Sequence, residues 1–269
     1  MSAARPGVEA APGQRRKVPL VAWSAGTVVT LAVLWFAITA AKVVGRAYLA
    51  TPRGVWNELV GLLENGYKGK TLWAHIFTSL GRTLSGFALG VLLGVPLGLL
   101  SGYSKVIGAI MAPVMGFVRP IPPIAFIPMA VLYFGLGETG KVVLILFTAF
   151  NYAFVNAHAG ASTVPIAYYR AAESIGLTPT QIFFRVVLPA AVPQIFTGMK
   201  VAMALSWAVV VAAELVGAQA GLGFMISDAA QLFRIPVVFI GIALIGAIGL
   251  GLNVLLSAGE QRLVHWRGR

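Results

Sequence analysis

The sequence predicts an all-α integral membrane protein with about six transmembrane helices. Of its 269 residues, 58% are hydrophobic and 10% are charged, and the mean hydropathy is +0.87. Soluble domains have roughly 45–50% apolar and about 25% charged residues, so this chain has more apolar surface than a water-soluble fold can bury. The apolar residues also gather in runs long enough to cross a bilayer, which takes about 20 residues.

Six apolar runs are separated by shorter segments that hold most of the charges. We expect spans at Val18–Ala41, His75–Leu100, Val106–Leu136, Lys141–Ala161, Ala190–Ala218 and Ile235–Ala258. The first run exceeds the apolar core of a signal peptide, about 7–15 residues, so we interpret it as a retained helix. The resulting plan has a disordered cytoplasmic tail (1–17), a first span with an external amphipathic segment (18–74), a core of five spans (75–258) and a cytoplasmic tail (259–269).

The charges predict orientation rather than a nucleic-acid partner. The net charge is +12, but the basic residues are scattered between apolar runs and form no stripe with interleaved aromatic residues. With the N-terminus inside, the predicted inner segments hold eleven lysines and arginines and the outer segments seven. Because positive residues concentrate on the cytoplasmic side, we expect both termini in the cytoplasm.

The third apolar run contains five prolines, at positions 113, 120, 122, 123 and 128. Proline lacks a backbone N–H and kinks helices. In lipid such a break survives only where protein or a watery cavity satisfies the freed carbonyls. We therefore expect Arg119, Pro122 and Pro123 to line a translocation path.

The second span has glycine at every fourth position from 86 to 102. Residues four apart share one helix face, and small residues in this register let helix backbones approach closely in lipid. We interpret Gly86, Gly90, Gly94 and Gly98 as a packing face. Whether the contact lies within one subunit or between two is open.

Three charges fall within predicted spans, and such residues usually face a cavity or a partner because a charge in lipid is costly. For each, contact with the solute stands against a structural ion pair or an end residue that reaches out to the interface. For Arg82, near a helix start, reaching out to the interface is at least as reasonable as contact with solute. Arg119 directly precedes the proline-rich break. For Glu214, deep in the fifth span, we favour a pairing or gating role, and a place on the solute path is the alternative.

The sequence contains no complete catalytic or metal-binding motif that we recognise. The G-x-G-x-x-G match at 135–140 lies between two spans instead of in a βαβ unit, so we expect a tight turn there. The P-loop-like Gly69-Lys70-Thr71 has Glu64 where the motif needs its first glycine. The three histidines are isolated and the chain has no cysteine. We expect no enzyme activity, metal or cofactor in this chain.

The segment 162–189 is too polar to span and predicts two short helices that meet at a turn. The first is expected at Ile166–Ile175, ended by Gly176 in a left-handed conformation. Thr178 is the expected N-cap of the second, with Gln181 completing a capping box. We expect this second helix to end at Leu188-Pro189. A capped helix pair of this kind is suited to docking another protein.

This segment resembles the E-A-A…G…L-P loop of ABC-importer permeases, in which a short helix sits in a groove of the ATP-hydrolysing subunit. Arg170 stands where the family has glutamate, and Glu173 follows one turn later. The resemblance assigns ATPase coupling to Arg170, Ala171, Ala172, Glu173, Gly176, Leu177, Leu188 and Pro189.

Other stretches look like the nitrate, sulfonate, taurine and bicarbonate group of these permeases. They are R-P-x-P-P at 119–123, F-G-x-G-E-T-x-K at 134–141, A-E-L at 213–215 and G-L-G-F-M at 221–225. The resemblance runs from about Thr51 to the tail and is greatest to the taurine permeases.

The resemblance implies a type I importer fold in a bacterial inner membrane. It also implies a homodimer of this chain, two ABC ATPase subunits that bind ATP and Mg, and a separate solute-binding protein on the outer side. Alternating access would move a small anionic or zwitterionic solute inward, taurine or a related sulfonate being the best match. Arg119 would meet the sulfonate and Glu214 the ammonium group. The same permease with nitrate, bicarbonate or another small organic solute is the main alternative, and a stand-alone secondary transporter is a further one.

Overall fold

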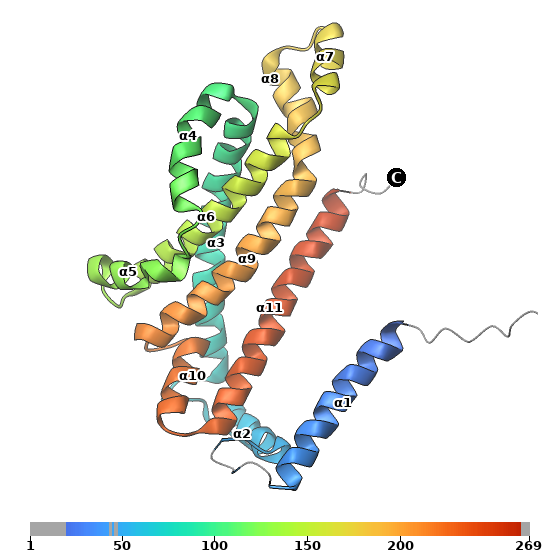
Figure 1. Cartoon of the computed structure of the whole chain (residues 1–269). Coiled ribbons are helices and arrows are strands. Elements are labelled where there is room, and N and C mark those ends of the chain that lie inside the picture. Colours follow the sequence, from blue (N-terminus) through green and yellow to red (C-terminus); the bar gives the residue numbers. More distant parts are fainter. Residues whose placement is uncertain (1–19, 43–44, 46–47, 265–269) are drawn as a thin grey trace, which may run out of the picture. The chain divides into compact units, whose positions relative to one another are not determined.

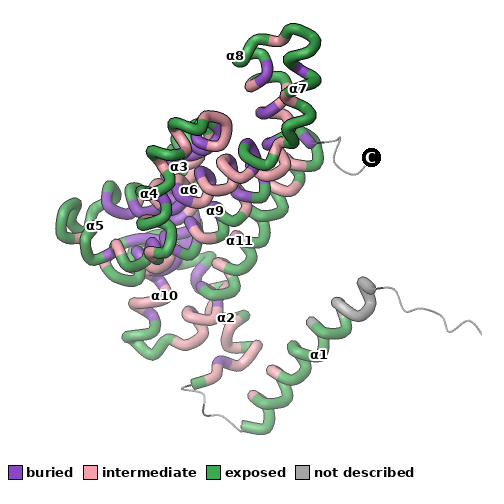
Figure 2. Tube along the Cα trace, turned by 45° about the horizontal axis from the view of Figure 1, so that its top comes forward, coloured by how far each residue is buried: buried purple, intermediate pink, exposed green. Residues whose placement is uncertain are grey.

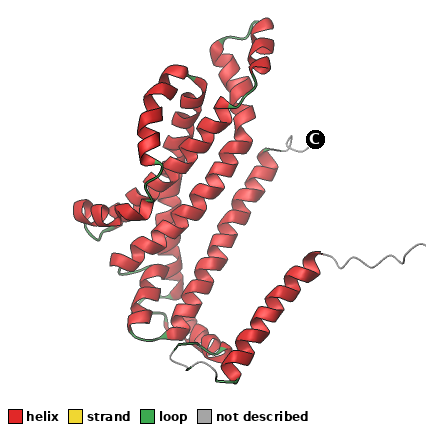
Figure 3. Cartoon of the chain, in the orientation of Figure 1, coloured by secondary structure: helices red, strands yellow, loops and turns green. Residues whose placement is uncertain are grey.

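The computed structural model describes residues 20–42, 45 and 48–264. This part of the chain is almost entirely helical and contains no strand (Figure 3). The predicted tail 1–17 and the last five residues of the predicted tail 259–269 lie outside the described residues. The chain divides into two units, 1–52 and 53–269, which are described in turn.

The first unit contains one apolar helix, α1 (Leu20–Ala40), inside the predicted first span. The large apolar side chains of its second half, such as Val33 and Phe36, are exposed, as the green colour of α1 in Figure 2 shows. A helix that is apolar on all sides suits lipid rather than water. Trp35, within α1, donates a hydrogen bond from Nε1 to the carbonyl of Ala50 at 3.0 Å. Because Ala50 lies beyond the end of the helix, this bond holds the following segment against α1.

The second unit contains four helices long and apolar enough to cross a membrane. They are α3 (Leu72–Tyr103), α6 (Glu138–Ser162), the helix 179–217 that ends in α9 (Leu188–Gly217), and α11 (Ile235–Leu263). A bent helix pair makes a fifth candidate span. These five coincide with the five predicted spans of the core, so the prediction of an all-α membrane fold is confirmed.

The glycine face of α3 packs against α6 of the same chain. Gly86, Gly90, Gly94 and Gly98 are buried, and a Cβ added at Gly90 would lie 2.6 Å from the Leu146 carbonyl oxygen of α6. A side chain at this position would therefore push the two backbones apart. In Figure 2 the residues coloured as buried gather where α3, α6 and α9 meet. The contact that the sequence left open is within one subunit.

The third predicted span is a broken helix. α4 (Lys105–Val118) is followed by a 3₁₀ turn (Pro123–Phe126) and by α5 (Ile127–Phe134), with a bend of 80° between the two halves. Figure 1 shows α5 projecting sideways from the end of α4. The break falls at residues 119–122, where prolines are consecutive or nearly so. Pro113 remains inside α4, and Pro128 sits in the first turn of α5, where a missing N–H costs nothing.

The predicted helix end at Leu188-Pro189 is wrong. α8 (Pro179–Ile182) passes through a π-helical turn (Phe183–Val187) into α9 without a break. In this turn the Leu188 N–H donates to the Phe183 carbonyl, five residues back. The wider turn gives the Pro189 ring room that a regular α-helix would not offer. The result is one helix from 179 to 217.

The end of the second unit opposite α7 and α8 is closed by α2 (Pro52–Asn65) and α10 (Leu222–Gln231), which pack over an apolar core. Tyr67, in the turn after α2, is 2% exposed and donates its hydroxyl to Asp228 Oδ2 at 2.7 Å. Burial, aided by this hydrogen bond, raises the pKa of Tyr67. The phenol therefore stays a neutral donor and holds α10 to the turn.

The α3–α6 contact predicts opposite effects for two glycine-to-alanine substitutions on α3. Gly90→Ala should destabilise the purified protein by about 1–3 kcal/mol, because overpacking forces the backbones apart. Gly81→Ala should leave stability unchanged or raise it slightly, because a Cβ there meets nothing within 4 Å and alanine favours helix. Thermal unfolding in detergent, followed by tryptophan fluorescence, measures both. Equal effects of the two substitutions would show that the close approach is unimportant.

Candidate functional site

The loop between α6 and α9 begins with α7 (Ile166–Ser174) and ends in the turn that starts α8. Gly176 has φ +78°, and its N–H donates to the Glu173 carbonyl at 2.9 Å. The Leu177 N–H donates to the Ala172 carbonyl at 3.1 Å. These two bonds form a Schellman motif, which ends α7 as the sequence predicted.

The capping box that the sequence predicts at the start of α8 is confirmed. The Thr178 hydroxyl accepts from the Gln181 N–H, and the Gln181 side chain accepts from the Thr178 N–H at 2.9 Å. The hairpin of α7 and α8 thus satisfies its own backbone groups at both helix ends. Such a loop keeps its shape while it projects from the bundle, as Figure 1 shows.

One side of the loop is anchored and the other is open. Ala172 is 4% exposed and packs with Ile182 and Val187. Tyr169 stacks on Tyr103 of α3, with ring centroids 6.3 Å apart. Burial raises the pKa of Tyr169. Because these residues fix the loop to α3 and α9, its outer side has a defined orientation.

The other residues predicted to couple to an ATPase lie partly on the outer side of the loop and partly on the helix behind it. Arg170, Ala171, Glu173 and Gly176 are exposed. Apolar side chains are exposed around them, with Ile166 at 65% and Ile175 at 76%. Leu177, Leu188 and Pro189 are half-buried, and the last two belong to the first turn of α9. An exposed apolar side on a rigid loop is suited to contact with another protein.

The broken helix borders a cavity of about 280 Å³, which we call the broken-helix cavity. One wall is the break itself, with Arg119, Pro122 and Pro123. The facing walls are Tyr152 of α6 and residues of α9, among them Leu205. The predicted path residues at the break therefore share one hollow. No acidic side chain lines it among the described residues.

Arg119 is exposed at the surface of the chain and its guanidinium has no ion-pair or hydrogen-bond partner among the described residues. It is the C-cap residue of α4 and lies between the two halves of the bent candidate span. Placing an arginine at the centre of a bilayer costs about 2.5–3.5 kcal/mol on insertion scales. Arg119 is thus available to an anion or to a partner outside this chain.

Glu214 does not line this cavity and has a different environment. It is 1% exposed, and Arg82 Nη1 donates to its Oε1 at 2.7 Å. Ser79 and the Gly223 N–H also donate to its carboxylate, at 2.8 and 2.9 Å. Glu214 therefore has an ion-pair partner, as the favoured pairing role requires, and both of its carboxylate oxygens accept hydrogen bonds. Contact with solute stays a prediction.

The interpretation of Arg82 as reaching out to the interface is wrong. Arg82 is 5% exposed and binds Glu138 through two hydrogen bonds of 2.5 Å, in addition to Glu214. It also donates to the Ala220 carbonyl at 2.8 Å. Glu214 of α9 meets it in the buried interior, and Glu138, which begins α6 and is 64% exposed, meets it from the surface side. The sequence held one indication of this pair: Arg82 and Glu214 are isolated charges of opposite sign in two different predicted spans.

This ion cluster holds the turn before α10 in place. Ser79 accepts from the Leu222 N–H at 2.9 Å, and the His75 ring lies 3.2 Å from the Gly221 backbone. Gly221 has φ +119°, and a Cβ there would collide with the Glu214 carboxylate. The G-L-G-F-M segment at 221–225 thus packs over the buried ion pair of Arg82 and Glu214.

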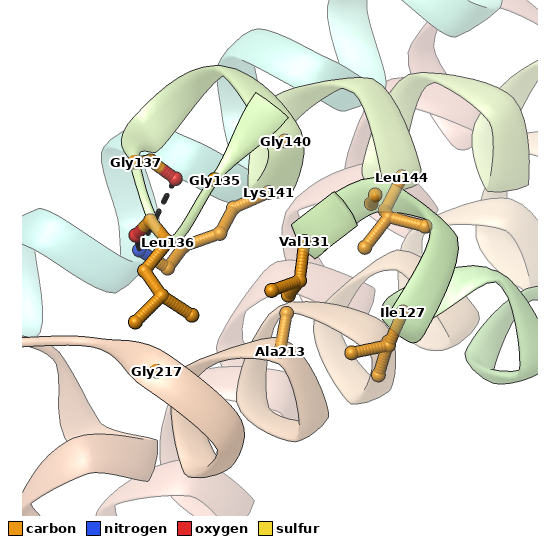
Figure 4. A pocket seen from close by; sticks show the side chains of 11 residues that line it. Ile127, Val131, Gly135, Leu136, Gly137, Gly140, Lys141, Leu144, Ala213 and Gly217 are labelled. Atoms are coloured by element: carbon orange, nitrogen blue, oxygen red, sulfur yellow. Dashed lines mark hydrogen bonds between the residues drawn. The ribbon is translucent and has the colours of Figure 1, made fainter. Parts of the chain in front are cut away.

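The turn at 135–137 is also tied down, by Lys141. Its Nζ donates to the carbonyls of Leu136 and Gly137 at 2.8 and 3.3 Å, the contact drawn in Figure 4. The pocket beside it has room for about 20 Å³, enough for about one water molecule and too little for an organic solute. The tight turn predicted from the glycines is confirmed, since Gly135 has φ +69°.

Known proteins resemble this chain along most of its length. The family model described as "Binding-protein-dependent transport system inner membrane component" matches residues 90–265. The taurine transport system permease protein TauC of Escherichia coli (strain K12) is 35% identical over 92% of this chain and 90% of its own. The putative aliphatic sulfonates transport permease protein SsuC of Bacillus subtilis (strain 168) is 30% identical over 95% and 91%.

A nitrate protein and a solved structure extend the comparison. The nitrate import permease protein NrtB of Synechocystis sp. is 35% identical over 75% of this chain and 73% of its own. A chain of the inward-facing MetNI methionine ABC transporter has a TM-score of 0.62 at 20% identity, over 79% of this chain and 99% of that chain. The structural likeness shows the fold, which is that of type I importer permeases.

The buried ion cluster predicts strong coupling between Arg82 and Glu214. Glu214→Gln should lower stability by on the order of 3 kcal/mol, because it leaves a buried arginine short of a partner. In the Glu214→Gln variant, Arg82→Met should lower stability much less than it does in the unmodified protein. Protease resistance and thermal unfolding in detergent measure the cycle, with exposed Glu173→Gln as the control. Additive losses would contradict this interpretation of the pair.

Proposed function

We propose, from the premise that this chain belongs to the family of binding-protein-dependent transport system inner membrane components, that it imports taurine or a related sulfonate. The chain is the permease component of an ABC importer for small solutes, because its relatives are permeases along nearly the full length of both chains. It works in the inner membrane. Both termini and the loop helices α7 and α8 face the cytoplasm in this proposal.

The rigid, exposed loop helix α7 is the observation that carries the proposal. It docks in a groove of a separate ABC ATPase subunit, which binds ATP and Mg. The exposed side of α7 supplies apolar contacts, and its Schellman end keeps its direction. Because residues 179–217 form one helix, motion of the docked loop passes directly to Leu205 at the broken-helix cavity.

The unpaired Arg119 supports a homodimer. A guanidinium exposed at the break of a membrane span is costly where it faces lipid. A second copy of this chain on the same face, with a water-filled path between the copies, removes that cost. Two ATPase subunits and a solute-binding protein then complete the importer, and alternating access moves the solute from the outer to the inner side.

The chemistry of the broken-helix cavity supports an anionic group on the solute. A guanidinium binds a sulfonate through two parallel hydrogen bonds, and such charged hydrogen bonds are among the strong ones. The lining has no carboxylate to repel the anion. Glu214 is left out of the proposed contact, because Arg82, Ser79 and Gly223 already occupy it.

Nitrate or bicarbonate import is the second candidate. A nitrate permease matches this chain at the same 35% identity as the taurine permease, and a guanidinium suits either anion. A stand-alone secondary transporter is disfavoured, because an exposed docking loop would have no use there. Solute binding to the accompanying binding protein separates these candidates.

Two glycines with matched backbones test the coupling loop. Gly176 and Gly69 have φ of +78° and +76°, and neither has an atom within 4 Å of an added Cβ. A β-branched residue is strained in this conformation. Gly176→Val should lower ATP-driven taurine uptake by about tenfold or more, whereas Gly69→Val, on the opposite end, should keep most of it. Equal uptake by both variants in proteoliposomes with the ATPase would contradict the docking role.

Arg119 has a separate test. Arg119→Ala should lower uptake by about tenfold or more, since hydrogen bonds to charged groups contribute on the order of 1.5–3 kcal/mol. Arg119→Lys should retain part of the activity because it keeps the charge and loses the paired hydrogen bonds. Lys105→Ala, at the exposed start of the same helix, is the control. Normal uptake by an assembled Arg119→Ala transporter would exclude this arginine from the path.

A further inference from the structure

Arg119 borders a second cavity besides the broken-helix cavity. This cavity, of about 180 Å³, lies between α3, α4 and α6, and Ser101, Met115 and His158 are among its lining residues. We call it the histidine cavity. Arg119 is the residue that both cavities share.

The histidine cavity lies toward the loop helices. Ser101 and His158 are near the C-terminal ends of α3 and α6, and α7 follows α6 along the chain. Close by, the Tyr103 hydroxyl donates to the Pro179 carbonyl of α8 at 3.0 Å. In the proposed orientation, a solute that leaves Arg119 inward meets this cavity before it reaches the cytoplasm.

The polar groups of this cavity are prepared for an anion. Ser101 Oγ and His158 Nδ1 are 3.1 Å apart, and Ser101 is 4% exposed. When Ser101 donates to Nδ1, the ring carries its proton on Nε2 and presents a donor. Among the described residues Nε2 has no hydrogen-bond partner. The Phe154 ring stacks on the imidazole at 6.3 Å and steadies it.

The charge of the lining decides the class of ligand. Arg119 is the charged residue that lines the histidine cavity, and no acidic side chain lines it among the described residues. The remaining walls are apolar, with methionine and phenylalanine. A cation would find no counter-charge here, whereas a small anion would find Arg119 at one end and the His158 donor at the other.

We infer that Ser101 and His158 form a second binding site for the transported sulfonate, reached after Arg119 on the inward path. The inference rests on the proposed function and adds two residues that the sequence did not single out. The two sites share one guanidinium, so the anion can pass between them without losing all of its charged contacts.

Transport by the complete importer tests this second site. His158→Ala and Ser101→Ala should each lower taurine uptake per ATP hydrolysed by about tenfold, the size expected for a lost hydrogen bond to a charged group. ATPase activity stimulated by the binding protein should persist. His158→Gln, which keeps a side-chain donor, should restore part of the uptake, and Lys105→Ala, outside the cavity lining, should be neutral. Unchanged uptake in His158→Ala would overturn the inference.

A binding measurement covers the case of a variant that does not assemble. The chain has three histidines, so the ¹⁵N imidazole resonance of His158 can be assigned in labelled permease. Millimolar taurine or methanesulfonate should shift it, and tetramethylammonium should not. A resonance that no sulfonate moves would overturn the second site.

The outcomes separate the two proposals. If Arg119→Ala loses uptake while the His158 and Ser101 variants are normal, the proposed function stands and the second site falls. If the unmodified importer takes up no sulfonate, the proposed function fails and the second site falls with it.

Discussion

The close approach of α3 and α6 sets the geometry of the second unit. Two apolar helices in lipid gain little from the hydrophobic effect, so their association depends on packing and on backbone proximity. Glycines at every fourth position of α3 meet alanines of α6, including Ala149 and Ala153, which are at most 1% exposed. The register of this contact brings Arg82 to Glu138 at one end and Ser101 to His158 at the other.

The arginines at positions 82 and 119 show how the same type of side chain can serve structure or, as proposed, function. Arg82 is enclosed by Glu138, Glu214 and a backbone carbonyl, and its charge is used to close the turn before α10. Arg119 has no partner among the described residues and stands where two cavities meet. A buried and satisfied charge stabilises one arrangement of helices, whereas an unsatisfied charge beside a cavity is free to bind an anion.

The loop and the cavity are linked by the course of one helix. The π-helical turn at Phe183–Val187 lets the chain continue through Pro189 instead of breaking there. A break would have allowed α8 to move independently of α9. A continuous helix connects the loop, the adjacent end of the bundle and the wall of the broken-helix cavity, so that they can move together. This is the mechanical basis of the proposed coupling.

Composition and spacing alone determined the membrane class, five core spans, the helix break after Arg119, the capped loop helices and the glycine face. These are local properties: hydropathy, missing N–H groups and residue periodicity act within a few turns of helix. The partners of Arg82, the shared position of Arg119 between two cavities and the pairing of Ser101 with His158 depend on the tertiary structure. Each joins residues more than fifty positions apart in α3 and α6, or side chains from three helices. Only packing in space decides which of them meet, because helix register and rotation are set by contacts that no single segment contains.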